Sequence, residues 1–220
     1  MAIGLYLSSQ GLGENPASLQ PTSNEAHQAL IVLNALDPYS SARTYALPNE
    51  TAQLATLGYQ CSELDLRHHF QLSTDTLEHN QDKTARLAEL LAGCTLIWVA
   101  GGNTFVLARA MQQSQFKTAL FAAADLAQHT ITYGGYSAGA AVIGPDLQGI
   151  HLMDDSKVLP DQYDSHTEPI ALNLVSERII PHYQSQSDDS ANADRAVSYL
   201  EKAQLKFRTL RDGEVWLTHC

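Results

Sequence analysis

The chain is short of positive charge and contains no long apolar run. Its 220 residues include 13 basic and 24 acidic side chains, which gives a formal net charge of -11. A surface of that charge repels a phosphate backbone, so we expect no nucleic-acid partner. No stretch approaches the roughly 18 uninterrupted apolar residues of a membrane span, so we expect no membrane partner either.

Cysteine is too sparse to form a scaffold. The three cysteines, Cys61, Cys94 and Cys220, are odd in number and widely spaced, which makes a poor disulfide framework. No CxxC pair, HExxH motif or clustered His/Cys spacing occurs, so we expect no metal site and no cofactor. The N-terminus also lacks the basic and apolar regions of a secretory signal. These features predict a reduced, cytoplasmic protein.

Apolar residues are plentiful, at 44% of the chain, and are enough for a sizeable core. The length favours a single domain over residues 1–220, with no internal repeat and no clear linker. We expect such a protein to act as a monomer or a homodimer.

Short apolar runs alternate with amphipathic segments along the chain. The runs predict strands over residues 3–7, 59–66, 95–100, 130–133 and 178–181. The amphipathic segments predict helices over residues 48–58, 76–91, 105–112, 115–128 and 191–202, the first beginning at Pro48. Residues 207–217 resemble a hairpin that turns at Asp212-Gly213. Repeated strand–helix alternation predicts an α/β sandwich with a largely parallel sheet.

The turn after the strand at 130–133 matches G-x-S-x-G, as Gly135-Tyr136-Ser137-Ala138-Gly139. A sharp strand-to-helix turn strains the serine backbone and lifts its hydroxyl clear of the sheet, which favours a nucleophile at Ser137. The N–H groups of the following helix can stabilise an oxyanion. The alternative is that Ser137 only caps that helix, since serine is a favoured N-cap.

A second glycine turn, Gly101-Gly102-Asn103-Thr104, follows the strand at 95–100. Ligands of parallel sheets bind at the carboxyl ends of strands, so this turn and Ser137 would face one crevice. A Gly-Gly peptide can bring an N–H close to a substrate carbonyl. The alternative is a plain strand–helix turn in which Asn103 or Thr104 caps the helix.

A serine nucleophile needs a general base and an acid that orients it. His182 follows the strand at 178–181 and would therefore lie in the same crevice, whereas His151 and His166 lie in an irregular segment and are weaker candidates. Several acids lie between Ser137 and His182 in the sequence, namely Asp154, Asp155, Asp161 and Asp164. Spacing alone does not choose among them.

Three motifs together resemble the aspartyl dipeptidase (peptidase E) and cyanophycinase family of serine peptidases. They are Ala100-Gly101-Gly102-Asn103-Thr104-Phe105, then Gly135-Tyr136-Ser137-Ala138-Gly139-Ala140, then Pro181-His182. The tail, Leu210-Arg211-Asp212-Gly213-Glu214, also fits. The resemblance covers most of the chain, and the paired GGNTF and SAGA motifs are far more specific than G-x-S-x-G alone.

The resemblance implies a three-layer α/β fold similar to class I glutamine amidotransferases, with a flavodoxin-like sheet. It also implies Ser137 as nucleophile, His182 as base and an orienting acid within Met153-Asp154-Asp155-Ser156, where Asp154 is favoured narrowly over Asp155. The glycine turn would bind substrate, with the Gly102 and Ala138 N–H groups as oxyanion donors. Aspartyl dipeptidases hold the substrate's aspartate with an arginine downstream of the histidine, and Arg195 is the basic residue there, among acidic neighbours.

The sequence therefore predicts a serine peptidase that hydrolyses short peptides in the manner of a dipeptidase, with N-terminal aspartate among the candidate specificities. One alternative is an esterase of the α/β-hydrolase fold, although the interval from Ser137 to His182 leaves little room for its further strand–helix units. Another is a binding or regulatory protein that uses the same scaffold without catalysis.

Overall fold

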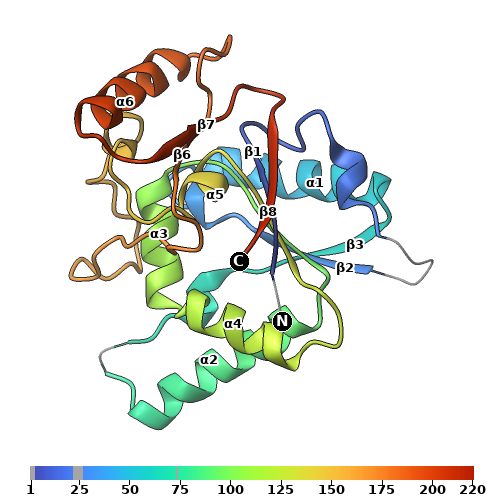
Figure 1. The fold of residues 1–220 in the computed structure, drawn as a ribbon. Coiled ribbons are helices and arrows are strands. Elements are labelled where there is room, and N and C mark those ends of the chain that lie inside the picture. Colours follow the sequence, from blue (N-terminus) through green and yellow to red (C-terminus); the bar gives the residue numbers. More distant parts are fainter. Residues whose placement is uncertain (1–2, 22–26, 73) are drawn as a thin grey trace.

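A mostly parallel six-stranded sheet forms the centre of the computed structural model, which describes residues 3–21, 27–72 and 74–220 (Figure 1). The strands are β1 (Gly4–Ser8), β2 (His27–Val32), β3 (Tyr59–Glu63), β4 (Leu96–Val99), β5 (Thr132–Tyr136) and β8 (Val215–His219). Their order is β3-β2-β4-β5-β1-β8. All neighbours pair in parallel except β8, which runs antiparallel to β1 at the edge.

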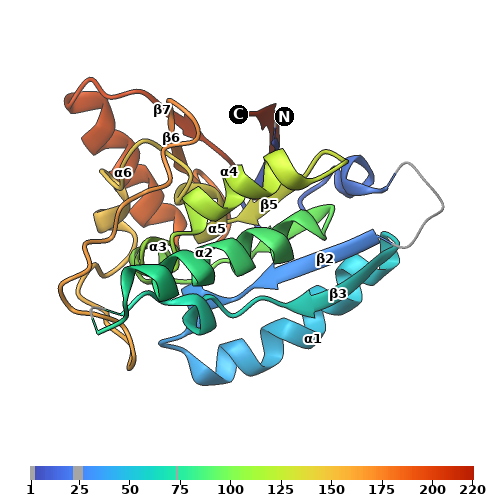
Figure 2. The ribbon, with the colours of Figure 1, turned by 90° about the horizontal axis from the view of Figure 1, so that it is seen from below.

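Helices cover both faces of this sheet, as Figure 2 shows: α1 lies on one side, and α2 and α4 lie on the other. The helices are α1 (Ser40–Thr56), α2 (Leu77–Ala92), α3 (Thr104–Gln113), α4 (Phe116–Leu126), α5 (Ala138–Ala141) and α6 (Ser190–Lys202). A second, two-stranded sheet pairs β6 (Arg178–Ile180) with β7 (Phe207–Thr209) in parallel. The predicted three-layer α/β fold with a mostly parallel sheet is confirmed.

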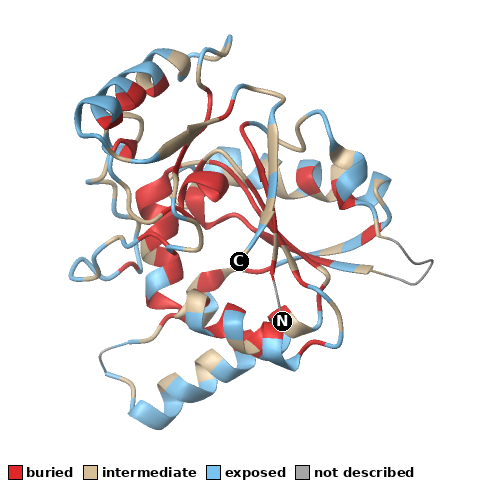
Figure 3. Cartoon of the chain, in the orientation of Figure 1, coloured by how far each residue is buried: buried red, intermediate tan, exposed pale blue. Residues whose placement is uncertain are grey.

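The alternation of side chains along β4 explains the layers. Leu96 and Trp98 point into one apolar cluster, which includes residues of α1, whereas Ile97 and Val99 point into the other, which includes residues of α2, α3 and α4. All four side chains are fully buried, so the strand is covered on both faces (Figure 3). A continuous apolar run in the sequence is typical of such a strand.

Apart from shifted strand ends, two features differ from the sequence prediction. Helix α1 begins at Ser40 and not at Pro48, which lies inside it. Proline removes only one N–H and keeps a helical φ, so a helix of 17 residues can contain it at the cost of a missing bond. The predicted hairpin over 207–217 is wrong, because β7 pairs with β6 while β8 pairs with β1. The turn at Asp212-Gly213 therefore connects two different sheets.

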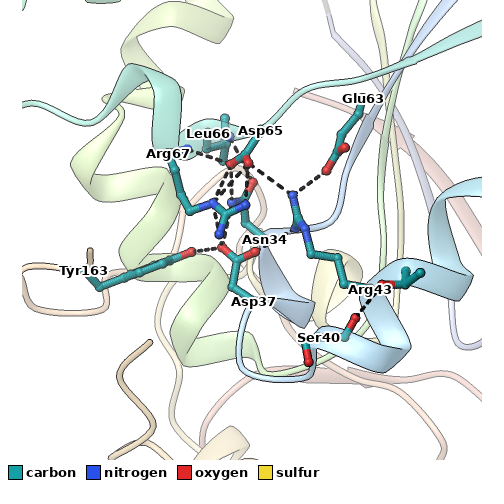
Figure 4. A network of polar contacts seen from close by, with 10 residues as sticks. Asn34, Asp37, Ser40, Arg43, Glu63, Asp65, Leu66, Arg67 and Tyr163 are labelled. Carbon is teal, nitrogen blue, oxygen red and sulfur yellow. Dashed lines mark hydrogen bonds and ion pairs between the residues drawn. The ribbon is translucent and has the colours of Figure 1, made fainter. Parts of the chain in front are cut away.

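A polar network fastens the loops at the carboxyl end of β2 and β3 (Figure 4). The fully buried Asp37 carboxylate accepts hydrogen bonds from Arg43, at 2.7 Å, and from the hydroxyl of Tyr163. Asp65 caps the following 3-10 turn and pairs with Arg67 at 2.6 Å. Burial alone would raise the pKa of Asp65, but the hydrogen bonds from Arg67 hold it well below its usual range. Through Tyr163, this network anchors the irregular segment that follows α5.

Among the described residues, none of the helices combines the length and the apolarity that crossing a bilayer requires.

Candidate active site

Three parallel strands end at the same edge of the sheet and bring distant segments together. β1 leads to Ser9, β4 leads to the turn at Gly101-Gly102, and β5 leads to Ser137. A Cβ placed on Gly101 would lie 3.0 Å from the Ser137 Cβ, so these two turns are in direct contact. The predicted crevice at the carboxyl ends of the strands therefore contains both motifs.

Ser137 occupies a sharp turn between β5 and α5. Its backbone has φ 50° and ψ -113°, a strained conformation that a nucleophile turn of this type requires. Its N–H donates to the Ser9 carbonyl at 3.1 Å, and its side chain makes no capping bond to α5. Gly139 permits the close packing, because a Cβ there would lie 2.2 Å from the Val99 carbonyl oxygen. The capping alternative for Ser137 is therefore not what the geometry shows.

The Ser137 hydroxyl points at His182. Its Oγ lies 3.0 Å from His182 Nε2, and His182 Nδ1 lies 2.8 Å from Asp212 Oδ1. His182 is 7% exposed, and its own backbone has φ 60°. Serine, imidazole and carboxylate thus form one continuous hydrogen-bonded row.

The acid in this row is not one of the two expected from the sequence. Asp154 accepts a hydrogen bond from the Thr104 N–H at 2.8 Å, and Asp155 accepts one from the Lys157 N–H at 2.9 Å. The expectation that either of them orients His182 is corrected here, because Asp212 occupies Nδ1. The sequence pattern places Asp212 only in the turn of the tail motif. The signal that could have found it is its position three residues past β7, the strand that runs parallel to the one before His182.

Ser9 is a further site residue that sequence reasoning missed. Its hydroxyl donates to Asp212 Oδ1 at 2.8 Å and accepts the His182 backbone N–H at 2.7 Å. Its carbonyl also accepts the Ser137 N–H. This fully buried serine therefore contacts all three members of the row.

The second glycine turn caps α3 through Asn103 and lines the cavity of Ser137 through Gly102. Gly102 has φ 136°, and a Cβ there would lie 2.4 Å from the Ala35 carbonyl oxygen, so only glycine fits. Asn103 caps α3, because its Oδ1 accepts the N–H groups of Phe105 and Val106, each at 3.0 Å. Asn103 is thus a structural residue, while Gly102 and Ala138 line the same cavity as Ser137.

That cavity is small and contains two acids. Its volume is about 140 Å³, and its lining includes Ser137, His182, Asp154 and Asp189. Burial, followed by the nearby charge of Asp189, raises the pKa of the Asp154 carboxyl, against the lowering effect of the Thr104 hydrogen bond. A larger hollow of about 570 Å³ borders Asp212, but Ser137 is not in its lining. Chemistry at Ser137 therefore belongs to the smaller cavity.

Arg195 does not take the place expected for a substrate-binding arginine. It is exposed on α6, where its guanidinium donates to Asn192, and it lies outside the cavity lining. Within the part of the chain that the structure describes, His, Cys, Asp and Glu side chains form no group of three that could hold a metal ion. The site consists of a serine, a histidine and carboxylates.

The fold and the site together define an α/β protein of three layers with a Ser–His–Asp row at the carboxyl ends of its strands. The chain belongs to peptidase family S51, whose family model matches residues 26–218. The resemblance drawn from its motifs is thereby confirmed.

Two curated relatives are uncharacterized peptidases. One, from Pasteurella multocida, is 32% identical over 126 residues, which cover 54% of this chain and 56% of that protein. The other, from Listeria innocua, is 30% identical over 132 residues, which cover 60% of this chain and 54% of that protein. The matches thus span about half the length of these relatives.

Two solved structures share the fold. A protein of Listeria monocytogenes EGD-e, whose assignment to peptidase E is provisional, superposes with a TM-score of 0.70 at 20% identity over 100% of both chains. A peptidase from an acI-B1 Actinobacterium gives a TM-score of 0.58 at 19% identity, covering 88% of this chain and 75% of that one.

Proposed function

We propose that this protein is a serine peptidase that hydrolyses short peptides through an acyl-enzyme on Ser137. The observation that carries the proposal is the row Ser137–His182–Asp212, with Oγ to Nε2 at 3.0 Å and Nδ1 to the carboxylate at 2.8 Å. Membership of a peptidase family supports the same conclusion.

Each group in the row has a role that its contacts support. With Nδ1–H donated to Asp212, His182 Nε2 accepts the Ser137 proton as Oγ attacks the peptide carbonyl. The carbonyl oxygen becomes an oxyanion, for which the N–H groups of Gly102 and Ala138 are the candidate donors at the cavity wall. His182 then protonates the leaving amine. In the second half, His182 takes a proton from water as the water oxygen attacks the acyl carbonyl, and that proton goes to Ser137 Oγ as the acid product leaves.

The cavity favours short substrates with a free amino end. Its volume of about 140 Å³ lies below the roughly 300–1,000 Å³ of sites that enclose drug-sized ligands. Asp154 and Asp189 in its lining would attract an α-ammonium group and repel an aspartyl side chain. We therefore propose a dipeptidase-like specificity for neutral or basic N-terminal residues, and not for N-terminal aspartate.

The test is hydrolysis of a library of X-nitroanilides and dipeptides, Asp-X included, by the wild type and by Ser137→Ala. We expect turnover of neutral or basic X, weak turnover of Asp-X, and no turnover by the variant. Preferred cleavage of Asp-X would retain the mechanism but overturn the specificity. Activity that survives in Ser137→Ala would overturn the mechanism itself.

A matched pair of variants tests the acid. Asp212→Asn should lower kcat by roughly 10³–10⁴-fold, since the imidazole loses its orienting carboxylate. Asp155 is exposed and lies in the segment over residues 153–156 that the resemblance favours, so Asp155→Asn should retain wild-type kcat. A larger loss of kcat in Asp155→Asn than in Asp212→Asn would instead assign the orienting role to residues 153–156.

A further inference from the structure

A buried carboxylate outside the Ser–His–Asp row joins the two strands that carry the site. Glu50 lies in α1 and is 3% exposed. Its Oε2 accepts the Trp98 Nε1–H at 2.7 Å, and its Oε1 accepts the Tyr136 hydroxyl at 2.9 Å. Burying a carboxylate is costly unless its oxygens are satisfied, and here each oxygen has a different donor.

The two donors belong to the strands that end in the two functional turns. Trp98 lies in β4, three residues before Gly101, and Tyr136 directly precedes Ser137 at the end of β5. The two rings also contact each other, with centroids 5.9 Å apart. One carboxylate therefore bridges the strand of the glycine turn and the strand of the nucleophile.

Tyr136 itself reaches the glycine turn. A Cβ on Gly101 would lie 3.0 Å from Tyr136 Cε2, so the ring packs directly against that backbone. Burial and then the charge of Glu50 raise the pKa of the Tyr136 hydroxyl, while the nearby Gly101 backbone acts in the opposite direction. The hydroxyl thus donates to the Glu50 carboxylate while the ring packs against the Gly101 backbone.

We infer that Glu50 is a positioning residue, which acts through Tyr136 to hold the nucleophile turn and the glycine turn at a fixed separation. The inference rests on the proposed function, because that separation matters only if an oxyanion forms between Ser137 and Gly102. Loss of the bridge would leave substrate binding intact and misplace the oxyanion donor relative to Oγ.

The test measures the labelling of Ser137 by a fluorophosphonate, together with kcat and KM for the best dipeptide. Glu50→Gln keeps the side-chain shape but offers one acceptor for two donors, and Tyr136→Phe removes only the hydroxyl. For both variants we expect the maximal labelling rate and kcat to fall by roughly 10- to 100-fold. The apparent KI and KM should stay within about twofold of wild type.

Tyr59→Phe is the matched control, because the Tyr59 hydroxyl also makes a buried hydrogen bond, to the Leu19 carbonyl at 2.6 Å, but lies at the amino end of β3, opposite the strand ends that carry the site. It should lower the thermal midpoint and leave the labelling rate unchanged. The inference is overturned if folded Glu50→Gln and Tyr136→Phe label at the wild-type rate, or no more slowly than this control. Failure of the wild type itself to label would instead overturn the proposed function, so the two failures are distinguishable.

Discussion

Individual residues at the site are held in conformations that the backbone alone would not choose. Ser137 and His182 both have positive φ, at 50° and 60°. Such conformations cost of order 1–3 kcal/mol each for a residue with a side chain and persist only where surrounding contacts impose them. For both residues, Ser9 supplies part of that restraint, through one hydroxyl and one carbonyl.

Removal of the Ser9 hydroxyl should therefore affect catalysis more than stability. We expect Ser9→Ala to lower kcat by about tenfold, because Asp212 loses a donor and the His182 backbone loses its acceptor. Ser8→Ala is the matched control, since Ser8 is equally buried and its hydroxyl bonds the Gly11 carbonyl instead. Steady-state kinetics on both variants decide the matter, and equal losses of kcat would contradict a specific role for Ser9.

Asp154 should favour binding of the substrate's amino group, but it should lower the stability of the folded protein at neutral pH. Its folded-state pKa is raised, so the native state binds more protons than the unfolded state, and stability falls as pH rises from the unfolded pKa through the folded one. Each unit of such a shift is worth about 1.4 kcal/mol. Asp154→Asn should therefore be more stable than wild type at neutral pH, an advantage that disappears below the unfolded pKa.

Denaturation with urea at neutral and at acidic pH measures this difference, and kinetics on the same samples measure substrate binding. We expect Asp154→Asn to raise KM for substrates with a free amino end and to change KM little when that amine is acetylated. A variant that is less stable than wild type at neutral pH would contradict the assignment of burial as the dominant cause.

At the scale of elements, glycine turns and loops determine how closely the strand ends approach. Gly102 lies against the Ala35 carbonyl of the short 3-10 turn that follows β2, and the Asn103 N–H donates to that same carbonyl at 2.9 Å. The turn after β4 is therefore placed by the end of β2. On its other side, the Asn103 amide donates to the Asp155 carbonyl at 2.9 Å, which brings the segment with Asp154 to the cavity.

Gly102→Ala should consequently damage both the fold and the activity. Its Cβ would lie 2.4 Å from backbone oxygen at a φ of 136°, so the turn must move or the segment must strain, at a cost of roughly 1–3 kcal/mol. Gly58→Ala is the control, because Gly58 also has positive φ, at 98°, but meets no atom within 4 Å.

Thermal unfolding and the labelling rate of Ser137 should distinguish Gly102→Ala from Gly58→Ala. We expect both variants to be destabilised and only Gly102→Ala to label more slowly. Equal labelling rates would mean that the glycine turn does not contribute to the oxyanion site.

At the scale of the whole molecule, the net charge of -11 biases which substrates approach. Cationic dipeptides should have a KM that rises with ionic strength, because salt screens the attraction over a Debye length of about 10 Å at 0.1 M. Anionic dipeptides should show the reverse trend. The measurement is KM for Lys-X, Ala-X and Asp-X over a series of salt concentrations. If KM responds to salt in the same way for all three dipeptides, steering by surface charge is contradicted.

The sequence alone was sufficient for most of what depends on neighbouring residues, although it misplaced the start of α1 and predicted a hairpin over 207–217 that does not form. Apolar runs and helical spacing predicted the layers, because burial on two faces and on one face leave different periods in the chain. The motif around Ser137 predicted a strained turn, because small residues on both sides of a serine at a strand end are typical of a sharp strand-to-helix turn. The position of His182 followed from the strand before it.

Tertiary structure decided which distant groups meet. His182 bonds an acid 30 positions away, and its N–H bonds a serine 173 positions away. Tyr136 bonds Glu50 across 86 positions. No local period encodes such contacts, since they depend on strand order and on the path of each loop. That is why the family resemblance could favour Asp154, whereas the fold places Asp212 against His182.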